Sequence, residues 1–91
     1  MNWEHELAPW IGRLVDIRIE DQAGLDPISP PKMATLHRVE QREGGRELAF
    51  YLNESQFVSV PLFEGPQTRL SGQTFETIDT QAQLIYKVIL L

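Results

Sequence analysis

The chain of 91 residues contains no cysteine, which excludes a disulfide scaffold, a cysteine-ligated metal site and a cysteine nucleophile. It also lacks a glycine-rich phosphate loop, because its paired glycines, Gly44 and Gly45, fall in a predicted hairpin turn and not between a strand and a helix. No catalytic, metal-ligand or nucleotide-binding motif is present. We therefore predict no cofactor, no metal and no catalytic residue, and expect a protein that is not an enzyme.

Long apolar runs are also scarce. The longest, residues 84–91, is far below the roughly 20 residues that a membrane-spanning helix requires, and it contains Lys87. The first ten residues have neither the basic start nor the apolar segment of a signal peptide. These features predict no membrane partner and a cytoplasmic location.

Basic residues are few, since 8 Lys and Arg stand against 13 Asp and Glu, for a net charge of −5. Such a charge repels phosphate backbones and anionic lipid surfaces. Arg18, Arg42 and Arg46 each lie within two positions of an acidic residue, as expected of paired surface charges. Nucleic acid is therefore not an expected partner.

Residues 33–63 predict a meander of three antiparallel strands, because charge and apolar patterns agree on one register. The expected strands are residues 33–41, 46–53 and 57–63. A two-residue turn at the glycine pair places Arg42 opposite Glu47 and Val39 opposite Phe50. Opposite charges then pair with each other, and apolar residues pair with apolar ones.

A second turn, at residues 54–56, continues the meander. It places Phe50 opposite Val60 and Leu52 opposite Val58. Pro61 donates no hydrogen bond to a neighbouring strand, so the third strand should lie at an edge or contain a bulge.

The N-terminal part predicts a short helix followed by a strand. Asn2 can cap a helix over residues 3–8, and Trp3, Leu7 and Trp10 then share one side, as a lid on the core. Residues 13–20 alternate apolar and charged side chains, which predicts a half-buried strand. The prolines of residues 21–32 predict an extended loop.

The C-terminal part contains a second loop at residues 64–74, a short strand at 74–78 and an ambiguous segment at 81–91. Thr80 and Gln83 fit a capping box that could open a helix. The β-branched Ile85, Val88 and Ile89 favour a strand instead. Because this strand is apolar on both faces, it should lie in the centre of a sheet or pair with its copy in a homodimer.

We therefore predict one all-β domain over residues 1–91. Its expected architecture is a small antiparallel meander of five to six strands, forming a partly closed barrel or curled sheet with a short N-terminal helix. The predicted function is a non-enzymatic interaction module that contacts a protein partner through the outer face of the meander. That face carries the candidate binding residues Leu36, Arg38, Tyr51 and Phe57.

Two alternative functions follow from the same residues. His37 lies on the apolar face of the predicted register and could serve a small-ligand-binding or catalytic barrel at its mouth. Arg38, Tyr51 and Phe57 could instead stack on single-stranded nucleic acid, although the net charge of −5 disfavours this.

Overall fold

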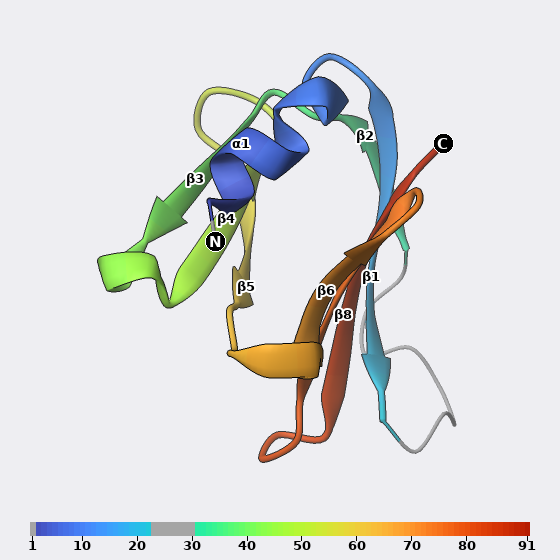
Figure 1. The fold of residues 1–91 in the computed structure, drawn as a ribbon. Coiled ribbons are helices and arrows are strands. Elements are labelled where there is room, and N and C mark those ends of the chain that lie inside the picture. Colours follow the sequence, from blue (N-terminus) through green and yellow to red (C-terminus); the bar gives the residue numbers. More distant parts are fainter. Residues whose placement is uncertain (1, 23–30) are drawn as a thin grey trace.

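The computed structural model describes residues 2–22 and 31–91, and these residues form eight strands in two antiparallel sheets (Figure 1). The five-stranded sheet has the order β2-β1-β8-β7-β6, and the three-stranded sheet has the order β3-β4-β5. The strands are β1 (Leu14–Asp21), β2 (Lys32–Thr35), β3 (Arg38–Arg42), β4 (Glu47–Tyr51), β5 (Phe57–Pro61), β6 (Thr68–Ser71), β7 (Thr74–Asp79) and β8 (Leu84–Leu90).

Helix α1 (Trp3–Leu7) and the 3-10 turn that follows it (Ala8–Trp10) lie across one end of the two sheets (Figure 1). The Asn2 side chain accepts a hydrogen bond from the His5 N–H at 3.1 Å, which confirms the predicted N-cap. Trp3, Leu7 and Trp10 are all buried in the core cluster, so the prediction of a lid is confirmed. This short helix does not approach the length needed to cross a membrane, and neither does any other helix of the described residues.

The predicted barrel or curled sheet of five to six strands is wrong, because eight strands form two sheets and the chain switches between them inside the segment expected as one strand over residues 33–41. The Leu36 N–H donates to the Arg13 carbonyl at 2.9 Å, which extends the β1–β2 pairing. The next N–H, of His37, donates to the Tyr51 carbonyl at 2.7 Å and thus joins the other sheet. Two short strands in different sheets replace the long one, and the sheets stay separate.

The first predicted hairpin register is confirmed. Arg42 is opposite Glu47 and Val39 is opposite Phe50. The turn is longer than the predicted glycine pair, because the strands are paired only as far as Arg42 and Glu47. Within it Glu43, Gly44 and Gly45 all have positive φ, at 54°, 67° and 89°. Glycine reaches this region without strain, which explains the pair at this position.

The second predicted register is wrong by two residues, since Phe50 faces Val58 and not Val60. The Asn53 side-chain oxygen accepts hydrogen bonds from the N–H groups of Ser55 and Gln56, each at 2.9 Å. This compact turn begins one residue earlier than expected. A two-residue shift keeps every side chain on its predicted face, so the core assignment survives.

Residues 84–90 form a strand, as the β-branched residues favoured, and β8 lies in the centre of the five-stranded sheet between β1 and β7. Both edges of β8 are paired, so the homodimer suggested for this segment has no free edge to use. The strand predicted at 74–78 is present as β7, whereas β6 lies within the predicted loop at 64–74. The loop predicted at 21–32 falls largely on residues 23–30, which lie outside the described residues.

The core joins the two sheets through aromatic contacts. The ring centroids of Phe50 in β4 and Phe75 in β7 are 5.5 Å apart, and both side chains are fully buried. Trp3 meets Phe75 edge to face at 5.2 Å, which ties α1 to the same cluster. The inner faces of the two sheets therefore pack together around this aromatic cluster.

Candidate protein-interaction surface

Three of the four predicted binding residues meet on the outer face of the three-stranded sheet. Arg38 is the cross-strand partner of Tyr51, and Tyr51 is the partner of Phe57. The sequence-based register placed Phe57 one row away, and the shift at the Asn53 turn brings it beside Tyr51. Arg42 joins this group. We call Arg38, Arg42, Tyr51 and Phe57 the aromatic–arginine cluster.

In the aromatic–arginine cluster, a guanidinium group lies over each aromatic ring. The Arg38 Cζ is 4.0 Å from the Tyr51 ring centroid, and the Arg42 Cζ is 5.0 Å from the Phe57 centroid. The two rings contact each other with centroids 4.9 Å apart and planes tilted by 38°. These distances are those of cation–π and offset aromatic contacts.

The members of the cluster differ in accessibility. Tyr51 is only 7% exposed, because Arg38 and Phe57 pack over it, whereas Phe57 is 41% exposed. The Arg38 side chain is 49% exposed and lies 3.4 Å from Glu40 in an exposed ion pair. Tyr51 is thus the base of the cluster, and Phe57 with the guanidinium groups forms its accessible part.

Leu36 does not belong to this surface. Its side chain is fully buried in the core between the sheets, next to the point where the chain changes sheet. Arg42 was not among the predicted binding residues, although the alternation of side chains along a strand places residues 38 and 42 on the same face.

His37 lies at the rim of a separate hollow of about 480 Å³, near Leu36, Leu52 and Glu54. Its side chain is exposed, and no described residue forms a hydrogen bond with the imidazole. A general base is normally oriented by a second polar group. Asn53 and Glu54 line the same hollow, but neither they nor any other described residue forms a hydrogen bond that orients the imidazole.

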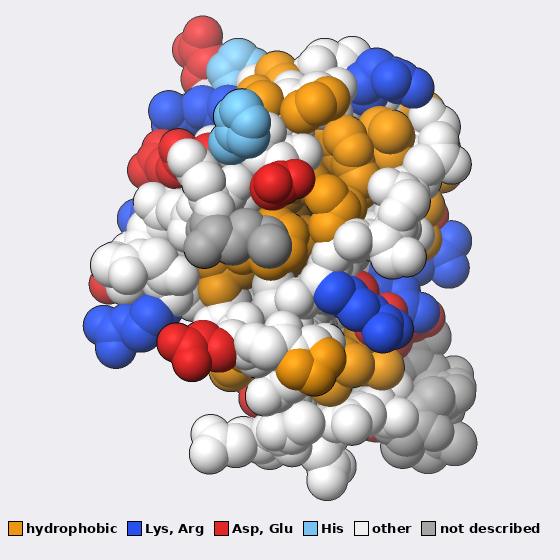
Figure 2. Space-filling model, viewed as in Figure 1, with side chains coloured by type: hydrophobic (Ala, Val, Ile, Leu, Met, Phe, Trp, Pro, Cys, Tyr) orange, Lys and Arg blue, Asp and Glu red, His pale blue; other side chains and the backbone are white. Residues whose placement is uncertain are grey.

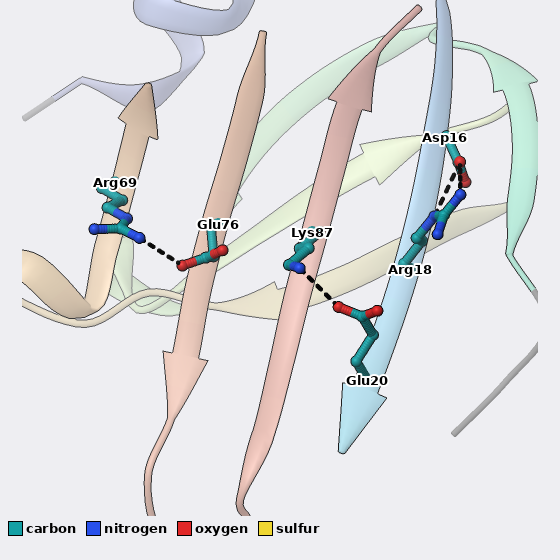
Figure 3. Close-up of polar contacts among 6 residues, drawn as sticks. All are labelled: Asp16, Arg18, Glu20, Arg69, Glu76 and Lys87. Carbon is teal, nitrogen blue, oxygen red and sulfur yellow. Dashed lines mark hydrogen bonds and ion pairs between the residues drawn. The ribbon is translucent and has the colours of Figure 1, made fainter. Parts of the chain in front are cut away.

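The outer face of the five-stranded sheet carries charges that pair with each other (Figure 3). Arg69 in β6 binds Glu76 in β7 at 3.2 Å, and Lys87 in β8 binds Glu20 in β1 at 2.8 Å. Arg18 contacts Asp16 at 2.9 Å, and this hydrogen-bonded carboxylate raises the pKa of the guanidinium. The acidic and basic groups of this face therefore neutralise one another.

A third surface is apolar. Figure 2 shows a band of apolar side chains beside α1. The segments that carry the exposed Ile11, Leu14 and Leu91 meet at this end of the molecule, where the Leu91 N–H donates to the Leu14 carbonyl at 3.0 Å. These side chains are aliphatic, so they lack the directional contacts of the aromatic–arginine cluster.

Among residues 2–22 and 31–91, no group of three or more histidine and carboxylate side chains lies where it could hold a metal ion. Glu4, in the Glu4-His5-Glu6 run, accepts a hydrogen bond from the Gln41 N–H at 2.6 Å. That carboxylate has a structural role, because it covers the edge of β3.

Comparison of the chain with known proteins found no matching family model, no matching curated protein and no matching solved structure.

Proposed function

We propose that the chain is a non-enzymatic interaction module that contacts a protein partner through the aromatic–arginine cluster. The main support for this proposal is the exposure of Phe57. This large aromatic side chain is 41% exposed and lies beside two guanidinium groups that stack on aromatic rings. Aromatic and arginine side chains dominate the binding energy of protein interfaces.

The stacked arginines define the chemistry of the partner. A guanidinium that lies over a ring can still donate its N–H groups outward, to carbonyl or carboxylate oxygens. Phe57 supplies the apolar contact next to these donors. We therefore expect a partner surface with an apolar pocket for Phe57 and acceptor oxygens at its rim.

Single-stranded nucleic acid fits this surface less well. Bases stack on open aromatic faces, whereas the ring of Tyr51 is covered by Arg38 and Phe57 and is only 7% exposed. The net charge of −5 also opposes a polyanion.

Small-ligand binding at the hollow beside His37 is the second candidate. The observation in its favour is the volume of about 480 Å³, which is within the range of ligand sites. We rank it lower, because no described group orients the imidazole.

The proposal can be tested by affinity capture with the full chain and two exposed-residue variants. Phe57→Ser should reduce recovery of a partner at least about tenfold, as expected for loss of an aromatic anchor. The matched control is Met33→Ser, which alters a side chain that is 61% exposed on β2, and it should leave recovery unchanged. Equal recovery with the wild type and Phe57→Ser would contradict the proposal.

A further inference from the structure

The backbone of β5 has one edge bonded to β4 and one edge that no described strand occupies. The Leu52 N–H donates to the Gln56 carbonyl at 2.8 Å, and the Leu62 N–H donates to the Arg46 carbonyl at 2.9 Å. These bonds fix the alternation along the antiparallel pair. The backbone groups of Val58 and Val60 therefore face β4, whereas those of Phe57 and Ser59 face away from it.

The other outer strands carry features that block strand addition, and β5 carries few. The free edge of β3 is covered by α1, where Glu4 accepts the Gln41 N–H and the Gln41 side chain accepts the Trp3 N–H at 2.9 Å. Edge strands β2 and β6 each contain a basic residue, Lys32 and Arg69. Charged residues and covering elements protect edges against further pairing.

In contrast, the β5 sequence, FVSVP, contains no charge. Its only protective residue is Pro61, which removes one N–H at the end of the strand. The β5 edge is thus uncharged along its length, in a chain whose net charge is −5. Two such strands can approach each other without opposing like charges of their own; the nearby cations are Arg42, 5.0 Å from the Phe57 ring, and Lys32, which borders the same hollow as Val58.

We propose that β5 pairs antiparallel with β5 of a second copy of this chain, about a two-fold axis beside Val58. In this register the N–H and C=O groups of Phe57 pair with those of the partner's Ser59, and the symmetric pair forms on the other side of the axis. All outward backbone groups of Phe57 and Ser59 then have partners, and the missing N–H of Pro61 is not needed.

A register centred on Ser59 is less favourable. It would place Phe57 opposite the partner's Pro61, which has no N–H for the Phe57 carbonyl. It would also align Glu54 with the partner's Glu64, so that two like charges face each other.

The side chains fit the register centred on Val58. Val58 is half-buried and borders a hollow of about 330 Å³ beside β5, which Leu52 and Lys32 also line, so the partner's Val58 would cover the apolar part of that hollow. On the outer face, Phe57 would meet only the small side chain of the partner's Ser59. The aromatic–arginine clusters of both copies would then stay exposed on one continuous sheet face.

Sedimentation equilibrium of the full chain, from about 1 to about 500 µM, tests the proposal over the range of weak to moderate complexes. The expected mass is twice that of the 10.4 kDa chain. Ser59→Pro removes an outward N–H that the monomer does not use, and it should raise the dissociation constant at least about tenfold. The matched control is Met33→Pro, an outward-facing position on the free edge of β2, which should leave the constant unchanged.

A wild-type chain that is monomeric at all concentrations overturns the proposal. So does a dimer that Met33→Pro weakens and Ser59→Pro leaves intact. If Ser59→Pro does not fold, hydrogen exchange of the wild-type amides tests the dimer instead. The Phe57 and Ser59 amides should become protected from exchange only as the protein concentration rises. Arg38→Ala alters the aromatic–arginine cluster on β3 and should retain the dimer, so loss of partner binding and loss of the dimer are separate outcomes.

Discussion

The outer faces of the two sheets use their arginines in different ways. On the five-stranded sheet, Arg18 and Arg69 bind carboxylates on their own or the next strand, so their charges are neutralised within the chain. On the three-stranded sheet, Arg38 and Arg42 lie over aromatic rings, and Arg38 also forms an exposed ion pair with Glu40. The two faces therefore differ in whether aromatic rings lie beneath the guanidinium groups, and this difference is the basis of the proposed interaction surface.

The largest expected change in stability comes from a substitution that tests whether the three-stranded sheet has distinct inner and outer faces. Phe50→Ala should lower the free energy of unfolding by about 3 to 5 kcal/mol, because it leaves a cavity where Phe50 meets Phe75. Phe57→Ala, on the opposite face, should cost less than about 1 kcal/mol. Denaturant unfolding measures both. Equal losses would mean that the two faces are not distinct.

The second test separates the base of the aromatic–arginine cluster from its accessible part. Tyr51 and Phe57 were both predicted as residues of an exposed binding surface, but Tyr51 is only 7% exposed. Tyr51→Ser should therefore lower the free energy of unfolding by about 2 to 4 kcal/mol, whereas Phe57→Ser should change it by less than about 1 kcal/mol. A thermal melt that shows no difference between these variants would place both side chains in the same environment.

The smallest effect concerns the paired charges of the five-stranded sheet. Glu76→Gln should cost less than about 1 kcal/mol in low salt, because the Arg69 partner is 61% exposed and well screened. The cost should shrink further at about 1 M salt, where screening acts over about 3 Å. Glu54→Gln is a control, since no described residue forms an ion pair with Glu54. A cost that persists in high salt would show that Glu76 acts through packing or hydrogen bonding instead.

Local features of the sequence predicted the faces of the strands well. The charges at Arg42 and Glu47 and the apolar pair of Val39 and Phe50 fixed the first register, because both pairs lie within one hairpin. The division into two sheets was not predictable in this way. No glycine or proline marks the switch at Leu36, and the bonds that cause it go to Arg13 and Tyr51, which are distant in sequence.

The candidate site was predicted only in part for the same reason. The alternation of side chains placed Arg38, Tyr51 and Phe57 on one face, and the structure has them there. The contact between the two rings depends on the turn that Asn53 organises, which periodicity does not reveal. Leu36 was misplaced because the prediction extended a strand beyond the residue where it ends.

The central position of β8 has a consequence for the order in which the sheets form. Each neighbouring pair of strands in the three-stranded sheet is a hairpin, so its loops are short and closing them costs little conformational entropy. In the five-stranded sheet, β6 with β7 and β7 with β8 are hairpins as well, but β1 must bring Val15 beside Leu90, and pairing over such sequence separation is slow. We expect the β3–β5 and β6–β8 segments to assemble first, each as a local meander, while one edge of β8 stays open. The step most exposed to aggregation is then the pairing of β1 with that edge.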